Sequence, residues 1–235
     1  MTTRKRISVI ALLMSLAAGT LVPAAEAAAS RYITISAQGS VKVVPDAVRI
    51  NASATAVAAT SKEALAATSK TASAVRTALK NSKIDSKDIA TQSVTVYPEY
   101  KYNTDGSSTL VGYRGSQSFT ITVRAADTAG AVVDSLVATG GDNLQINGAT
   151  PFILDSTNSL EAARAAAVKS AKAKATSYAK LMGVKLGKIN YLIENSAPTN
   201  YTPVMATAKA ESDATVIDLG QQDVTISVTV QWSLL

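Results

Sequence analysis

Two stretches near residue 180 contain residue types that catalytic motifs use. Ser177 and Lys180 fit the S-x-x-K pattern, in which the serine attacks an acyl carbon with the help of S-D-N and K-T-G motifs elsewhere in the chain. Ser212-Asp213 is followed by alanine, and no Lys-Thr-Gly occurs. We therefore interpret the match as a chance feature of a helix rich in alanine, lysine and serine.

Gly183 to Lys188 resembles a phosphate-binding loop, but three residues separate its glycines where that loop has four. Ile189 also stands where a serine or threonine must hold Mg²⁺. We interpret this stretch as the end of a helix followed by a turn.

Four carboxylates lie at the expected ends of strands: Asp46, Glu99, Asp155 and Glu194. A hydrolase that uses carboxylates alone would bring two of them together in a cleft. Turn and cap roles explain all four equally well, and their spacing singles out no pair.

The chain has no cysteine and no histidine. It therefore lacks the thiolate nucleophile and the commonest general base and metal ligand. We predict that the protein is not an enzyme and has no catalytic, cofactor-binding or metal-binding residues. It would then be a structural or a binding protein.

Residues 1–29 have the pattern of a secretory signal peptide. Arg4, Lys5 and Arg6 precede an apolar run, and small residues follow, with cleavage expected after Ala27 or Ala29. The alternative is a retained membrane anchor, but the run is short for a span of about 20 residues. We expect residues 30–235 to form the mature domain, without a stable membrane span. A cysteine-free exported protein fits the bacterial periplasm.

The net charge of +6 falls by two to +4 when Arg4, Lys5, Arg6 and Glu26 leave with the signal peptide. Such a small excess of scattered basic residues gives no support to a nucleic-acid partner.

The longest helical pattern spans residues 157–182 and contains no proline or glycine. Apolar residues recur every three or four positions, as on the buried face of a helix: Leu160, Ala163, Ala167, Ala171, Ala175, Tyr178 and Met182. Gly183 follows where a left-handed terminator is expected. Because the alanines are small, this helix can lie close to a sheet.

Two further helices are expected. One begins at a capping box, Thr60 to Glu63, and runs to about Lys80, with Asn81 as its left-handed terminator. Its apolar stripe consists of Leu65, Thr68, Ala72, Val75 and Leu79. The other spans 128–139, is capped by Asp127 and ends at Gly140-Gly141. Its expected inner residues are Val132, Val133, Leu136 and Val137.

Alternating apolar and polar residues predict strands before, between and after these helices. We expect two strands within 31–58, with a turn or bulge at 38–40 and a break at 45–46. A long hairpin follows over 91–124 with its turn at 103–108, then an edge or bulged strand at 144–154. A strand at 188–194 has Ile189, Tyr191 and Ile193 on one face, and 224–232 forms the last strand.

These elements predict an α+β fold with two layers, in which three helices cover a largely antiparallel sheet. The order is ββ-α-ββ-α-β-α-ββ.

Two regions are candidates for contacts with a partner. Four of the eight tyrosines surround the predicted hairpin: Tyr97, Tyr100, Tyr102 and Tyr113. Cross-strand aromatic packing is one explanation, and a partner or subunit contact is the other. Residues 195–214 contain two prolines and many small polar residues, so we expect a mobile loop or a segment that orders against another subunit.

The order of several short motifs resembles the SIMPL-domain, or YggE-like, family of periplasmic proteins, which includes a periplasmic immunogenic protein. Ile33 to Ser40 is similar to the opening strand of the family, and Val44 to Ala47 to its P-D-x-A step. Tyr97 to Tyr100 is similar to its P-x-Y strand. The strongest likeness is the helix that runs from Glu161 to Ala179, which resembles A-R-x-x-A-x-x-x-A-x-x-K-A.

This resemblance extends over about 200 residues and implies an exported α+β domain of poorly defined function. Family members are associated with oxidative-stress defence and antigenicity, and some form ring-like or channel-like homo-oligomers. The family supplies no catalytic residues. Arg164 and Lys174 match positions of its helix pattern, and we interpret both as structural.

We therefore predict a periplasmic protein without enzymatic chemistry that forms a homo-oligomer and has an indirect role in envelope or oxidative-stress defence. The alternative is a periplasmic binding module for a small ligand or an envelope protein partner. Without cysteine, a thiol-based antioxidant mechanism is ruled out.

Overall fold

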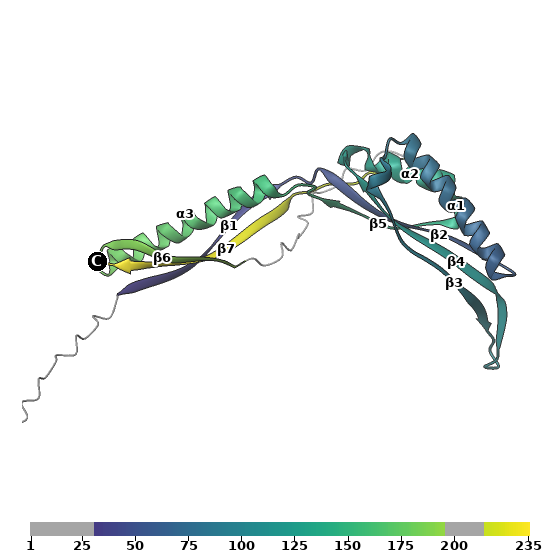
Figure 1. Cartoon of the computed structure of the whole chain (residues 1–235), viewed down its shortest axis with the longest axis horizontal. Helices are drawn as coiled ribbons and strands as arrows, with labels where there is room; N and C mark the ends of the chain where they lie inside the picture. Colours follow the sequence, from purple (N-terminus) through teal and green to yellow (C-terminus); the bar gives the residue numbers. More distant parts are fainter. Residues whose placement is uncertain (1–30, 196–213) are drawn as a thin grey trace, which may run out of the picture.

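The computed structural model of this chain describes residues 31–195 and 214–235. The predicted signal peptide and nearly all of the predicted loop at 195–214 lie outside these ranges. The described residues form two units arranged end to end along an elongated molecule (Figure 1). We call them the first and the second layer, and each consists of one sheet with the helices that cover it. Each layer has its own antiparallel sheet and its own hydrophobic core.

The first layer contains strands from both ends of the described chain. Its three-stranded sheet has the order β1-β7-β6, formed by Tyr32–Val43, Gln222–Leu234 and Leu186–Asn195. Helix α3, Thr157–Leu181, covers one face of this sheet (Figure 1). The strict alternation of buried and half-exposed residues along β7 matches a strand with only one face in the core.

The helix α3 lies very close to β1. Its buried residues are all alanines: Ala163, Ala167, Ala171, Ala175 and Ala179. Gly39 of β1 faces this stripe, and a Cβ at Gly39 would collide with the backbone of Ala163 and Ala167. Small side chains on the helix and no side chain on the strand together permit this close approach.

The second layer contains a four-stranded sheet of order β3-β4-β2-β5. Its strands are Ala47–Ala58 (β2), Ile89–Tyr102 (β3), Ser108–Val123 (β4) and Leu144–Phe152 (β5). Helices α1, Ser61–Asn81, and α2, Ala129–Gly140, lie on the same face (Figure 1). The largest fully buried aromatic and aliphatic side chains of this core are Phe119, Ile50, Leu79, Ile121 and Leu136.

The predicted α+β class and the order of elements are confirmed, with the strands divided between two sheets. The capping box is present: the Thr60 hydroxyl accepts from the Glu63 N–H, and the Glu63 carboxylate accepts from the Thr60 N–H. The hairpin turn with Asp105-Gly106, the helix end at Gly140-Gly141 and the left-handed Gly183 are also as predicted.

Some local predictions were wrong. Residues 38–40 form no turn or bulge, because β1 pairs with β7 without a register shift and Gly39 serves the approach of α3 instead. Asp127 does not cap α2, whose N-cap is Thr128. The left-handed residue that follows α1 is Lys83 and not Asn81, which is the last residue of the helix.

The predicted apolar stripes were partly wrong at their ends. Ala64 is buried in α1 while Leu65 is exposed, and Ala179 is buried in α3 while Tyr178 and Met182 are exposed. In α2, Val137 is also exposed. In α1 and α3 the buried residue is the small alanine beside the exposed larger one, which permits a close approach of helix and sheet.

Strand β6 also differs from its prediction. The register with β7 shifts between Ile189 and Tyr191, so Ile189 lies opposite the buried Trp232 while Tyr191 lies opposite Gln231. Tyr191 and Ile193 therefore share a face, as predicted, but Ile189 does not.

Short connections tie the two layers together. Asp46 lies between β1 and β2, and its carboxylate accepts a hydrogen bond of 2.8 Å from the Leu154 N–H, which follows β5. Ile217 and Leu219, which precede β7, pack against the core of the second layer. No helix in the two described ranges has the length and apolar character needed to cross a bilayer.

Candidate functional site

The two motif-like stretches near residue 180 have structural explanations. Ser177 and Lys180 are both exposed on α3. Gly183 has φ of +68° and accommodates the end of that helix. A Cβ at Gly187 would collide with Ser233 of β7, so this glycine permits close strand pairing.

The four candidate carboxylates each have a separate partner. The Asp155 carboxylate accepts from the Thr157 N–H at 2.9 Å at the start of α3, and hydrogen bonds from Thr157 hold the pKa of Asp155 below its ordinary value. The Asp46 carboxylate accepts from Leu154, as described above. The contact of Asp155 is the local turn role expected from the sequence, whereas Asp46 makes a long-range contact.

The other two carboxylates form ion pairs with arginines. Arg164 of α3 binds Glu194 of β6 through two hydrogen bonds of 2.9 and 3.2 Å, and this contact raises the pKa of the arginine. Arg114 of β4 binds Glu99 of β3 at 2.6 Å. None of the four carboxylates lines either of the two clefts described below.

Arg164 and Lys174 join helix α3 to its sheet, as the sequence suggested. Arg164 reaches the edge strand β6 through Glu194, and Lys174 donates to the Ser36 carbonyl oxygen of β1 at 3.5 Å. Both contacts hold the helix across the sheet and present no reactive group.

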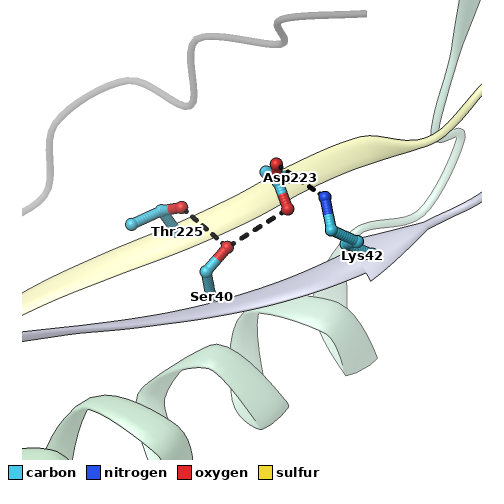
Figure 2. Close-up of polar contacts among 4 residues, drawn as sticks. All are labelled: Ser40, Lys42, Asp223 and Thr225. Atoms are coloured by element: carbon cyan, nitrogen blue, oxygen red, sulfur yellow. Dashed lines mark hydrogen bonds and ion pairs between the residues drawn. The ribbon is translucent and has the colours of Figure 1, made fainter. Parts of the chain in front are cut away.

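A cluster of serine, lysine and aspartate that the sequence analysis missed lies where β1 pairs with β7 (Figure 2). The Thr225 hydroxyl donates to Ser40 Oγ at 3.1 Å, and the Ser40 hydroxyl donates to Asp223 Oδ1 at 3.4 Å. Lys42 Nζ lies 3.3 Å from Asp223 Oδ2. Because the lysine is paired with the carboxylate, it is unsuited to remove a proton from Ser40. This cluster fixes strand register and does not form a nucleophilic site.

The same kind of pairing continues along the sheet faces turned away from the helices. In the first layer, the Ser36 and Thr229 hydroxyls are 3.0 Å apart. In the second layer, the Thr120 hydroxyl donates to Asn51 at 2.9 Å and the Ser53 and Ser118 hydroxyls are 3.1 Å apart. Cross-strand polar pairs of this kind stabilise a sheet and specify its register.

The hairpin tip, which we define as residues 97–113, carries several exposed apolar side chains. Figure 1 shows it extending beyond α1. Tyr100 is 47% exposed and Tyr102 is 82% exposed. The exposed apolar residues of the tip are Tyr97, Tyr100, Tyr102, Leu110 and Val111.

The register of the hairpin shows which residues lie opposite its tyrosines. Tyr97 lies opposite Arg114, Tyr100 opposite Leu110 and Tyr102 opposite Ser108, so no two of these tyrosines are direct cross-strand neighbours. Tyr100 lies opposite the apolar Leu110, as cross-strand packing expects, and the high exposure of Tyr102 is what a contact surface expects.

An ion pair supports the base of the hairpin tip. The Arg114 guanidinium lies against the Glu99 carboxylate, which raises the pKa of Arg114. The second Glu99 oxygen, Oε2, is buried and has no hydrogen-bond partner among the described residues. The pair couples β3 to β4 where the strands leave the cover of α1.

A cleft lies at the C-terminal end of α1, with a volume of about 490 Å³. Its lining combines three cations with two isoleucines and a short polar loop: Arg76, Lys80, Lys83, Ile84, Asp85, Ser86 and Ile89. The spacing of Arg76 and Lys80 would have placed them on one helix face from sequence alone, whereas Lys83 follows the helix. The neighbouring strand and loop that complete the cleft carry no such signal.

A second, smaller cleft of about 280 Å³ lies on the other side of the same loop. Asp88 and Arg124 line it and form an ion pair of 2.7 Å, and Lys83 and Asp85 line both clefts. Across the described ranges, no three acidic side chains gather closely enough to hold a metal ion.

Comparison with known proteins gives a consistent result. The model of the SIMPL family, described as a protein of unknown function (DUF541), matches residues 33–232. The 26 kDa periplasmic immunogenic protein of Brucella melitensis biotype 1 is 28% identical over 215 residues, which cover 86% of this chain and 84% of that protein.

Two proteins named uncharacterized protein YggE are also similar. The Edwardsiella ictaluri protein is 26% identical over 92% of both chains. The Escherichia coli K12 protein is 27% identical over 77% of this chain and 72% of its own length.

Proposed function

The chain belongs to the SIMPL family of proteins of unknown function, and we propose that it is an exported envelope protein that self-associates and performs no enzymatic chemistry. The observation that carries this proposal is the exposed apolar hairpin tip, residues 97–113. Tyrosine and aliphatic side chains that protrude from a sheet are the residue types that protein interfaces bury.

Two edge strands add to this proposal. β3 and β6 lie at the edges of their sheets, so one side of each backbone has no strand partner within the described residues. Ile189, Leu192 and Ile193 of β6 are exposed beside that edge. An apolar edge strand is a template for pairing with another chain, so β6 offers a second contact for a second copy.

The proposed location is the periplasm, reached through a signal peptide at residues 1–29 that is cleaved on export. The N-terminal sequence pattern and the periplasmic names of the Brucella relatives support this location. The proposed role in envelope or oxidative-stress defence comes from the family resemblance. It is indirect, because the chain has no cysteine for thiol chemistry.

Native mass measured by light scattering after size exclusion tests the proposal at micromolar concentration. We expect a discrete oligomer that is weakened by Tyr100→Ser. Tyr178→Ser is the matched control, since Tyr178 is 52% exposed on α3 and Tyr100 is 47% exposed on the hairpin tip. Loss of one interface tyrosine commonly costs about 1–2 kcal/mol, or roughly a tenfold change in dissociation constant.

A strict monomer would refute self-association. An oligomer that responds equally to Tyr100→Ser and Tyr178→Ser would refute the assignment to the hairpin tip and direct attention to the β6 edge.

A second candidate function is a binding module for a small ligand. The cleft at the end of α1 favours it, because a partly apolar cavity of about 490 Å³ falls within the usual size range of ligand sites. Ligand-dependent thermal stabilisation of a monomer would favour this function over self-association.

A further inference from the structure

We propose that the cleft at the C-terminal end of α1 binds a phosphate monoester that carries an apolar group. This assignment gives a ligand class to the second candidate function and does not depend on self-association. It rests on the charges that line the cleft, on the fixed position of one arginine and on an unusual backbone conformation at Lys83.

The charges of the cleft match a dianion. Arg76, Lys80 and Lys83 contribute three cations, and Asp85 contributes one carboxylate. Asp85 is already paired with Lys87, whose Nζ lies 3.2 Å from its carboxylate. Within residues 31–195 and 214–235, none of the three cations of the cleft has a carboxylate partner.

Arg76 is held in place without an acidic partner. Its Nη2 donates to Thr91 Oγ1 of β3 at 3.2 Å, and its guanidinium lies over the Phe119 ring at 5.2 Å from the centroid. These contacts leave other guanidinium N–H groups free to donate. A positioned guanidinium matches the oxygens of a phosphate, and the two lysines supply further positive charge.

Lys83 adopts the left-handed conformation of a helix end at a position where glycine is the usual residue. It has φ of +60°, the one positive value at a non-glycine residue in the described ranges. Three backbone hydrogen bonds end α1: Ser82 to Ala78, Lys83 to Lys80 and Ile84 to Leu79.

Helix α3 ends with the same three bonds: Met182 to Tyr178, Gly183 to Lys180 and Val184 to Ala179. The residue equivalent to Lys83 is Gly183, with φ of +68°. Glycine is the usual residue at this position because it adopts the left-handed region without a steric penalty.

The comparison of the two helix ends separates two explanations for the basic residues. A lysine in the last turn stabilises a helix end, and both helices have one, Lys80 and Lys180. That explanation does not extend to Lys83, because α3 makes the same end with glycine. Both helix ends need a left-handed residue, but lysine is more strained there than glycine, and strained residues cluster at functional sites.

The apolar part of the ligand is indicated by the isoleucines of the cleft. Ile84 and Ile89 are only partly buried and line the same cavity as the three cations. Apolar walls with a few convergent polar groups are characteristic of sites for small organic molecules.

Isothermal titration of the full-chain protein with phenyl phosphate tests the assignment. We expect saturable binding that weakens about tenfold in Lys80→Gln and in Lys83→Gly, because each removes one charge-assisted contact. Lys180→Gln is the matched control and should bind like the wild type, since Lys180 ends the other long helix away from the cleft. Benzoate, with one negative charge, should bind more weakly than phenyl phosphate.

Vesicles of phosphatidylcholine containing phosphatidic acid test whether the phosphate monoester comes from a lipid headgroup. Binding of either probe with the expected pattern of variants supports the proposal, and the probe that binds identifies the source. Failure of the wild type to bind either probe would overturn it, as would equal weakening by Lys180→Gln. Benzoate binding as tight as that of phenyl phosphate would overturn the choice of a dianion.

Native mass measured on the same samples keeps this result separate from self-association. Lys80→Gln and Lys83→Gly lie outside the hairpin tip and should leave any oligomer unchanged.

Discussion

The equivalent ends of α1 and α3 permit a direct measurement of backbone strain. Lys83 and Gly183 occupy the same position in the same set of three hydrogen bonds, with φ of +60° and +68°. We compare Lys83→Gly with Lys83→Ala. Both remove the charge, so the difference between them reports the backbone alone. Gly183→Ala makes the reverse change at α3.

The size of the effect follows from two opposing contributions. The left-handed conformation costs a residue with a Cβ about 1–2 kcal/mol. Glycine avoids this cost, but it also makes the unfolded chain more flexible, which lowers the free energy of unfolding by about 0.4–1 kcal/mol. Lys83→Gly should therefore be more stable than Lys83→Ala by about 1 kcal/mol, and Gly183→Ala should be less stable than the wild type by a similar amount. For a chain of this length, about 1 kcal/mol corresponds to roughly 2–4 °C in Tm.

Two optical signals assign the effects to the two layers. Trp232 is the single tryptophan of the chain and is buried in β7, so its fluorescence reports unfolding of the layer that contains α3. Far-ultraviolet circular dichroism reports both layers. In urea titrations, Gly183→Ala should lower the midpoint measured by Trp232 fluorescence. Lys83→Gly and Lys83→Ala should have different midpoints by circular dichroism.

Equal stability of Lys83→Gly and Lys83→Ala, together with a normal loss for Gly183→Ala, would refute the reasoning. It would mean that the backbone at Lys83 is unstrained and that the conformation of this residue indicates no function.

Two further predictions concern packing and pH. Gly39→Ala should destabilise the layer that contains α3 by about 1–3 kcal/mol, because the new Cβ would collide with the backbone of Ala163 and Ala167. Urea titration by Trp232 fluorescence measures this loss, and an unchanged midpoint would show that α3 does not lie as close to β1 as described. Asp88→Asn should lower stability near neutral pH, because the hydrogen-bonded ion pair with Arg124 holds the pKa of Asp88 below 3.8. A carboxylate whose pKa is lower in the folded than in the unfolded protein stabilises the fold at pH values above its unfolded pKa. This stabilisation is lost as the pH falls through the folded-state pKa. The urea midpoints of wild type and Asp88→Asn should therefore converge below pH 3.8, and a constant difference across that range would contradict the prediction.

Local patterns in the sequence determined most of the individual elements. The capping box at Thr60, the left-handed Gly183 and the Asp105-Gly106 turn depend on residues within a few positions of one another. Their conformations follow from local hydrogen bonding and sterics, which a short stretch of sequence encodes. The family resemblance also follows from the order of such short motifs.

The sequence could not show how the strands divide into two sheets. Val43 and Ala47 lie only a few residues apart, yet β1 pairs with β7 near the end of the chain while β2 pairs with β4 and β5. A break at Pro45 is compatible with a hairpin or with a strand that continues into another layer. The choice depends on partners far away in the sequence, such as the pairing of Ser36 with Thr229.

Only the tertiary structure decided which residues form surfaces and clefts. Alternation predicted Tyr191 on the same face as Ile189, but a register shift against β7 separates them. The spacing of Arg76, Lys80 and Lys83 is visible in the sequence, whereas the loop at Asp85 that closes the cleft beside them is placed by packing. Helical and strand periods fix the relative directions of nearby side chains, but long-range packing fixes what those side chains face.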